Sequence, residues 1–199
     1  MIPALRIAVA DDERDTREYL QEVLPRMGHV VVAVAENGRR LAEQIRETCP
    51  DLVITDIRMP GADGIETSVE FNRDKQIPVI LVSAHHDAEL LVRAGVDPIM
   101  AYLVKPVKEA DLKAAIAVAM MRFHHFMALV KETADLRQAL ADRKLIEQAK
   151  GILIKRLRVN EDEAFRRLRK LANDQNRKMV DVSRTVVEAE DVFRQMDKL

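Results

Sequence analysis

The sequence predicts an α/β protein with a doubly wound parallel sheet of five strands, a long helix after it and a small helical bundle. In the first half, short apolar runs alternate five times with segments whose apolar residues recur at helical spacing, as in βαβ units. From residue 109 to residue 156 there is no proline, and Gly151 is the only glycine. The helix that closes the last βα unit therefore has no evident stop.

The five βα units can be placed in chain order. We expect strands at residues 5–10, 30–35, 52–55, 78–82 and 100–104, and helices at 16–27, 38–48, 64–73, 88–94 and from 109 onward. Helices that connect parallel strands cover both faces of the sheet, and strands in such sheets are continuous apolar runs, as here.

The composition is that of a globular protein with room for two domains. Of the 199 residues, 48% are hydrophobic and 33% are charged, which is typical of a chain with a real core. The amino end reaches charged residues too early for a signal peptide, and no apolar run approaches the length of a membrane span. We expect a cytoplasmic protein with no membrane partner. Cys49 has no internal disulfide partner and is expected to be a small buried residue.

Polar residues close four of the predicted strands. Asp11 and Asp12 follow the first strand, Asp56 the third, Ser83 the fourth and Lys105 the fifth. An Asp at such a place often does no more than start a turn. In a doubly wound sheet, however, the carboxyl ends of the strands lie on one edge, so these residues converge on one site.

The chemistry of that site follows from its residue types. Three carboxylates that lie close together need a cation, and Mg²⁺ is the hard divalent ion that carboxylate, carbonyl and phosphate oxygens hold. Lys105 and Ser83 would grip a phosphoryl group. Asp56, partly neutralised by the ion, could then attack phosphorus and form an aspartyl phosphate.

These residues resemble the receiver domain of two-component response regulators, over about residues 4–122. The match consists of the acid pair, the acceptor Asp56 before Met-Pro-Gly, Ser83-Ala84 and Lys105-Pro106. The resemblance implies strand order 2-1-3-4-5 and a partner histidine kinase that phosphorylates Asp56. It implies Mg²⁺ held by Asp12, Asp56 and the Arg58 carbonyl with help from Asp11, and Tyr102 as the switch aromatic. Aspartyl-phosphate phosphatases are the rival, but the first strand lacks their Asp-x-Asp.

The long helix carries an apolar stripe that predicts a partner. Leu112, Ile116, Ala119, Phe123, Phe126 and Val130 recur at steps of four and three, and Leu129, Leu136 and Leu140 continue the stripe with a shift of phase. The stripe could instead fold back on its own chain. We expect a helical connector at residues 109–142, a coiled coil and a homodimer on activation.

The carboxyl-terminal region combines two further helices with a surplus of positive charge. Residues 143–184 contain 13 Lys and Arg against 6 Asp and Glu. With the end of the connector, the helices after Asn160 and near Met179 form a bundle. Its expected core is Ile146, Ala149, Ile152, Leu153, Phe165, Leu168, Leu171 and Val182. A charged cluster is often only a solvated face, but so strong a surplus on a small bundle indicates a polyanion.

Residues 143–196 resemble the ANTAR domain, an RNA-binding antiterminator module. The matching residues are Arg143 to Ile154, Glu163-Ala164-Phe165, Leu168-Arg169, Asn176 and Asp181-Val182. The resemblance implies binding of hairpin RNA in leader transcripts. Gly151 would permit close helix packing. The candidate RNA-binding residues are Arg143, Lys144, Lys150, Lys155, Arg156, Arg166, Arg169, Lys170 and Lys178.

The sequence therefore predicts a phosphorylation-controlled response regulator that binds RNA and is not a dedicated enzyme. Two alternatives stay open at this point. The protein could be a transcription factor that binds DNA, although no recognition helix stands out, or it could be a protein-only adaptor.

Overall fold

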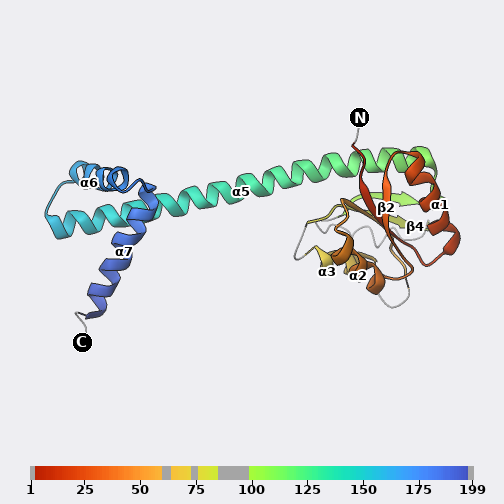
Figure 1. Ribbon diagram of the computed structural model, residues 1–199, viewed down its shortest axis with the longest axis horizontal. Coiled ribbons are helices and arrows are strands. Elements are labelled where there is room, and N and C mark those ends of the chain that lie inside the picture. The colour runs from red at the N-terminus through yellow and green to blue at the C-terminus, as the bar shows by residue number, and fades with distance from the viewer. Residues whose placement is uncertain (1–2, 60–63, 73–75, 85–98, 197–199) are drawn as a thin grey trace. The chain divides into compact units, whose positions relative to one another are not determined.

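The computed structural model describes residues 3–59, 64–72, 76–84 and 99–196, and the chain divides into two compact units, residues 1–127 and 128–199. The first unit contains β1 (Arg6–Ala10), α1 (Arg14–Arg26), β2 (Val30–Ala35), α2 (Gly38–Thr48), β3 (Leu52–Asp56), α3 (Gly64–Phe71), β4 (Val79–Ser83), β5 (Ile99–Val104) and the start of α5 (Glu109–Leu157). The rest of α5, α6 (Glu161–Asp174) and α7 (Met179–Met196) belong to the second unit (Figure 1). The helix predicted at 88–94 lies outside the described residues.

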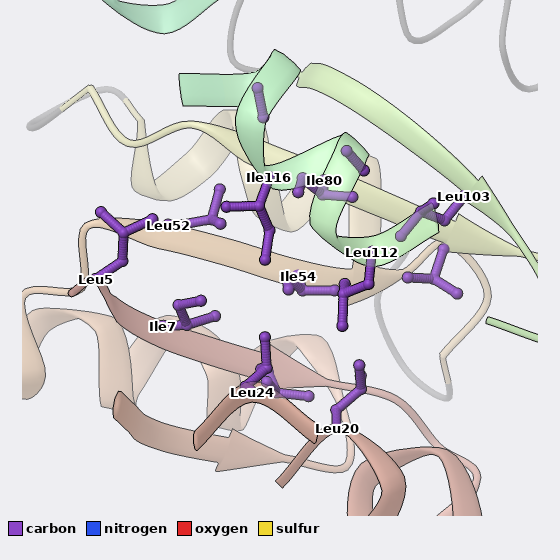
Figure 2. Packing of buried hydrophobic residues seen from close by; sticks show 14 of the residues in the cluster. Leu5, Ile7, Leu20, Leu24, Leu52, Ile54, Ile80, Leu103, Leu112 and Ile116 are labelled. Carbon is purple, nitrogen blue, oxygen red and sulfur yellow. The ribbon is translucent and has the colours of Figure 1, made fainter. Parts of the chain in front are cut away.

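The predicted fold class is confirmed. The five strands form one parallel sheet in the order β2-β1-β3-β4-β5. β3 and β4 are buried along their whole length, because helices cover both faces of the sheet. On one face, side chains from α1 and α5 pack against the strands, as Figure 2 shows for Leu20, Leu24, Leu112 and Ile116. The other face is covered by α2 and α3.

The apolar stripe on α5 divides into two parts with different roles. Leu112, Ile116 and Ala119 are fully buried in the first unit, and Phe123 and Phe126 pack against the same cluster. This part of the stripe therefore folds back on its own chain, which is the alternative to a coiled coil. The continuation of the stripe is exposed at Leu129, Val130, Leu136 and Leu140.

By length and composition alone, one stretch of α5 is apolar enough to cross a membrane. By that measure, the expectation that no apolar run approaches a membrane span is wrong. The helix is not a clear span, however, because core helices of other proteins meet the same criterion and α5 itself contributes to the core in Figure 2.

The second unit has a smaller core than the sequence suggested. Ala149, Leu168, Ala172 and Val182 are buried, and Leu153, Met179, Val186 and Val187 pack against them. The prediction that Phe165 and Leu171 belong to the core is wrong, since they are 39% and 42% exposed. They flank the buried stripe of α6, which is formed by Ala164, Leu168 and Ala172 at four-residue steps.

Two helix ends are fixed by local chemistry. Asn160 caps α6 as predicted, because its side-chain oxygen accepts a 2.9 Å hydrogen bond from the Glu163 amide. Cys49 ends α2 in a left-handed conformation with a φ of 47°. The expectation that Cys49 is buried is wrong, because this terminal position leaves the residue exposed.

Candidate functional site

Three carboxylates meet at the carboxyl edge of the sheet. Asp11 and Asp12 follow β1, and Asp56 is the last residue of β3. One carboxylate oxygen from each of the three lies within 4.8 Å of the others. Asp11 and Asp56 are buried, whereas Asp12 is exposed. Asp11 and Asp56 are 45 positions apart in the sequence. They meet because the carboxyl ends of parallel strands lie at one edge of the sheet.

Lys105 lies at the centre of this acid cluster. Its ammonium donates hydrogen bonds to Asp56 Oδ2 at 2.5 Å, to Asp11 Oδ1 at 3.1 Å and to Glu13 Oε2 at 2.9 Å. Burial disfavours the ammonium, but the hydrogen bonds to Asp56, Glu13 and Asp11 outweigh it and raise the pKa of Lys105. Lys105 therefore stays charged and neutralises part of the cluster.

Asp11 shows that one cation is not enough for this site. Burial, with a smaller contribution from the charge of Asp56, raises the pKa of Asp11 to about 6 against the opposing hydrogen bond from Lys105. Its Oδ2 atom is buried and lies 3.0 Å from Lys105 Nζ, yet no group among the described residues donates a hydrogen bond to it. A buried carboxylate oxygen without a donor, beside two further carboxylates, is a donor set that fits Mg²⁺.

The backbone around Asp56 is held closely. The Arg58 amide donates a 3.0 Å hydrogen bond to Asp56 Oδ1, which orients the carboxylate. Gly64 begins α3 directly against the end of β3, and a side chain at this position would collide with the Asp56 carbonyl oxygen. The Gly64 amide also donates to the Ile57 carbonyl at 2.9 Å. Glycine is thus required here by a close approach of two backbone segments.

Ser83 and Tyr102 occupy the neighbouring strands. Ser83 is fully buried at the end of β4, and its hydroxyl donates to the Ala84 carbonyl at 3.1 Å. The Lys105 amide donates to the Ser83 carbonyl at 2.8 Å, which ties the two residues together through the backbone. Tyr102 on β5 is half-buried and packs against the apolar cluster beneath α2 and α3.

Glu13 and Arg17 are contributors that the sequence reasoning missed. The Glu13 carboxylate accepts from Lys105 and, at 3.1 Å, from the hydroxyl of Thr16. Hydrogen bonding to Lys105 is the main reason why the pKa of Glu13 is lowered. Arg17 donates to the carbonyls of Asp11 and Asp12 at 2.7 and 2.9 Å and so fixes the loop. The acid run that continues from Asp12 to Glu13 was the available signal.

The second unit carries most of its predicted RNA-binding residues on the surface. The exposed ones are Arg143, Lys144, Lys155, Arg156, Arg166, Arg169, Lys170 and Lys178. On α6, Arg166, Arg169 and Lys170 follow the three- and four-residue spacing of one helical face, opposite the buried stripe of that helix. Arg166 pairs with Glu163 at 2.7 Å. Within the described part of the chain, Arg169 and Lys170 make no salt bridge and are free to meet an anion.

Lys150 is placed differently. It is only 7% exposed, although an outer face was expected. Its ammonium binds Glu147 on the same helix at 2.9 Å and Glu161, the first residue of α6, at 2.6 Å. Hydrogen bonds to Glu161 and Glu147 raise its pKa. Lys150 therefore joins α5 to the beginning of α6.

Gly151 does not serve close packing. A Cβ atom built at this position would meet no atom within 4 Å, so the expectation of a tight helix contact is wrong for the described residues. The residue lies inside α5, and a glycine inside a helix costs about 1 kcal/mol relative to alanine.

The two units together define a class of protein: a doubly wound parallel sheet with an acid cluster at its carboxyl edge, followed by a helical unit with exposed basic residues. The chain belongs to the response regulators that carry a carboxyl-terminal ANTAR domain. The model of the response regulator receiver domain matches residues 7–117, and the ANTAR domain model matches residues 134–187.

Curated relatives agree with this class. The chain is 37% identical to the transcriptional regulatory protein PdtaR of Mycobacterium tuberculosis over 92% of its own length and 89% of that protein. It is 33% identical to the uncharacterized transcriptional regulatory protein YrkP of Bacillus subtilis, over 60% of this chain and 51% of that protein.

Solved structures resemble the first unit. The receiver domain of a response regulator from Clostridium thermocellum covers 61% of this chain and 98% of its own, with a TM-score of 0.56 and 29% identity. The receiver domain of the putative response regulator NarL of M. tuberculosis gives a TM-score of 0.55 and 27% identity, over 60% of this chain and 98% of its own. A chain of the CheX-CheY-BeF3-Mg²⁺ complex from Borrelia burgdorferi gives a TM-score of 0.53 and 25% identity, over 58% of this chain and 87% of its own.

Proposed function

We propose that this response regulator accepts a phosphoryl group on Asp56 from a cognate histidine kinase and thereby controls an RNA-binding output. The contact that carries the proposal is the 2.5 Å hydrogen bond from Lys105 to Asp56, inside a cluster of two further aspartates. Mg²⁺ would be held by Asp11, Asp12, Asp56 and the carbonyl of Arg58. A receiver domain supports this role and not that of a dedicated enzyme.

The transfer can be written with this chain's residues. An oxygen of Asp56 attacks the phosphorus of a phosphohistidine, and the bond from phosphorus to the imidazole nitrogen breaks as the imidazole leaves. Lys105, released from the Asp56 oxygen that now bears phosphorus, turns to a phosphoryl oxygen. The Ser83 hydroxyl would donate a hydrogen bond to a second phosphoryl oxygen. As Ser83 moves toward the phosphate, the Tyr102 side chain would turn inward as the switch aromatic. Mg²⁺, when bound, neutralises charge that builds up on the phosphoryl oxygens.

The proposed output is binding of hairpin RNA in leader transcripts, which would prevent a terminator from forming. The ANTAR match and the basic face of α6, formed by Arg166, Arg169 and Lys170, support it. In this reading, residues 4–122 are the receiver, 109–142 the connector and 143–196 the RNA-binding domain, and the protein works in the cytoplasm without a membrane.

We also propose a homodimer on activation through a coiled coil of α5. Leu129, Leu136 and Leu140 are 60 to 68% exposed, and a helix with such a stripe is stabilised by a second copy. Phe126 packs against the receiver core. The proposed dimer interface, which we call the dimer seam, therefore lies on α5 after residue 126.

A transcription factor that binds DNA is the second candidate. The names of PdtaR and YrkP, which are called transcriptional regulatory proteins, fit this candidate as well. The surplus of base in the second unit suits DNA as well as RNA. A protein-only adaptor would leave that surplus without a role.

Recovery and sequencing of bound nucleic acid distinguishes these functions. The full chain is incubated with Mg²⁺, with and without acetyl phosphate, beside Asp56→Asn, whose amide cannot act as nucleophile. We expect phosphorylated wild type to recover hairpin RNA, and Asp56→Asn to recover as little as the untreated protein. Recovery of duplex DNA would favour the transcription factor, and recovery of neither would favour the adaptor.

A further inference from the structure

A groove of about 440 Å³ lies between α5 and α7 in the second unit. We name it the α5–α7 groove; its lining includes Gln148, Gly151, Ile152 and Lys155 from α5, and Val187 and Asp191 from α7. The groove belongs to one compact unit of the chain. It is separate from the basic face of α6, whose Arg166, Arg169 and Lys170 do not line it.

Gly151 gives this groove its depth. The residue lies inside a regular helix, so a glycine is not required by an unusual backbone conformation. A Cβ atom would meet nothing within 4 Å, so no neighbour within the described residues requires one either. A glycine inside a helix destabilises it relative to alanine. What Gly151 contributes is bare backbone next to open space, which an outside group can approach closely.

The walls of the groove suit a flat and partly polar group. Ile152 and Val187 are half-buried aliphatic side chains that can contact the faces of a ring. Gln148 carries both a donor and an acceptor in its amide, which is what the edge of a nucleobase requires. Lys155, exposed on the same helix, can meet a neighbouring phosphate.

One of the two acidic residues that line the groove is paired with arginines, whereas Asp191, the other, is exposed and makes no salt bridge among the described residues. Glu190 is held by Arg156 at 2.8 Å and by Arg194 at 3.4 Å. The Arg156 guanidinium, which lines the groove, also lies 5.1 Å from the centre of the Phe193 ring. A guanidinium plane is one of the surfaces on which an unpaired base stacks.

From these observations, we propose that the α5–α7 groove binds a single unpaired nucleobase from the loop of an RNA hairpin, with Gly151 as its floor. The inference rests on the proposed RNA-binding function and adds a division of labour. The basic face of α6 meets the phosphates of the stem, and the groove reads one base of the loop. Sequence-specific RNA recognition generally uses unstacked bases in this way.

A helix from a second copy is the competing occupant, since glycine also permits helices to pack closely. The exposed apolar residues suited to that partner lie elsewhere on α5, at Leu129, Leu136 and Leu140. The groove is lined instead by charged and amide side chains between two aliphatic walls, which favours a polar ring over an apolar helix.

The test compares Gly151→Ala and Gly151→Leu in the full chain, phosphorylated with acetyl phosphate and Mg²⁺. The probe is a pool of RNA hairpins with one fixed stem and a randomised loop, beside the same stem closed by an abasic loop. Ala189→Leu is the matched control, because Ala189 is an exposed small residue of α7 that does not line the groove. Wild type and the control should both prefer the loops with bases.

We expect Gly151→Leu to lose roughly tenfold in affinity for selected loops, the range of one stacked base, and to bind the abasic hairpin as wild type does. Gly151→Ala should weaken loop binding less and raise the melting temperature. Weaker binding by a more stable variant could not be attributed to unfolding.

Retention of the full loop preference by Gly151→Leu would overturn the groove assignment and leave RNA binding intact. A change in dimer mass without a change in loop preference would assign the groove to a second copy and also overturn it. If wild type binds no hairpin, the proposed RNA function itself fails.

Discussion

The Lys105 ammonium lies 2.5 Å from Asp56 Oδ2 and 2.9 Å from Glu13 Oε2, so one cation bridges the proposed phosphoacceptor and an exposed carboxylate. All three protons of the ammonium have acceptors, since Asp11 takes the third. We expect phosphorylation of Asp56 to exchange one of these contacts for a phosphoryl oxygen. Glu13 is thus a competitor for Lys105 and a negative charge beside the path of an anionic donor.

The first prediction is that Glu13→Gln accelerates labelling of Asp56 by acetyl phosphate. The Lys105 ammonium donates to both carboxylates and so holds the Glu13 charge beside Asp56 Oδ2. Because Glu13 is exposed, a dielectric near that of water applies, and removing its charge should raise the rate about threefold. Asp15→Asn, in the first turn of α1 just after Glu13, is the control. Slower labelling of Glu13→Gln would show that the carboxylate positions Lys105 productively.

The second prediction concerns the metal. Asp12→Asn should weaken Mg²⁺ binding and labelling of Asp56 together, because it removes one charge from a cluster that the ion holds together. Titration of Mg²⁺ followed by tyrosine fluorescence or calorimetry measures the first effect, and phosphate incorporation the second. Asp51→Asn, an exposed position immediately before β3, serves as the control. An unchanged titration would remove Asp12 from the proposed ligand set.

The acid cluster could be predicted from the sequence, but the side chains that pair with its lysine and with Lys150 could not. Parallel strands end at one edge, so Asp11, Asp56 and Lys105 could be brought together from the order of the elements alone. Glu13 reaches Lys105 only through its rotamer, and Lys150 reaches Glu161 only after α6 turns back along α5. Sequence spacing sets the face of a helix but not the pairing between helices.

The core of the second unit gives the same lesson. Periodicity placed Phe165 and Leu168 on one side of α6, yet only Leu168 is buried. Which edge of an apolar stripe meets a neighbour depends on the rotation of the helix. That rotation is fixed by packing and by links such as Lys150–Glu161. The open surface beside Gly151 could not be foreseen for the same reason.

The third prediction is a pH dependence of receiver stability from His29. Burial lowers the pKa of His29, whose Nδ1 accepts a hydrogen bond from the Leu5 amide at 3.3 Å. The unfolded chain therefore binds a proton more readily than the folded one, and stability falls as the pH drops below about 6.5. His29→Asn should reduce the dependence of the free energy of unfolding on pH in this range, while keeping an acceptor for the Leu5 amide. Denaturant unfolding of both proteins between pH 5 and pH 7.5 measures this dependence. The same pH dependence in wild type and His29→Asn would contradict the prediction.

The fourth prediction separates a phosphate contact from a positioning residue in the second unit. Arg169→Ala should weaken hairpin RNA binding and flatten the slope of log affinity against log salt by roughly 0.7 to 0.9, since one counterion release is lost. Lys150→Met should lower the melting temperature of the second unit and weaken binding with the slope unchanged, because Lys150 is already paired with Glu147 and Glu161. A flattened slope for Lys150→Met would restore it as a direct RNA contact.

The last prediction locates the dimer seam on α5. Leu136 and Leu140 are exposed at 60% and 68%, whereas Phe126 packs against the receiver core. Leu136→Asp should abolish dimers of the phosphorylated protein and leave the receiver's melting temperature unchanged, because the charge enters only the proposed seam. Phe126→Asp should instead lower that melting temperature, since it puts a charge against the core. Light scattering measures the mass of the protein, and circular dichroism measures its melting temperature.

Loss of the dimer should also weaken binding to a paired-hairpin RNA far more than to a single hairpin, because the second contact loses its effective concentration. Dimers that persist in Leu136→Asp, with that RNA preference intact, would place the seam elsewhere in the chain.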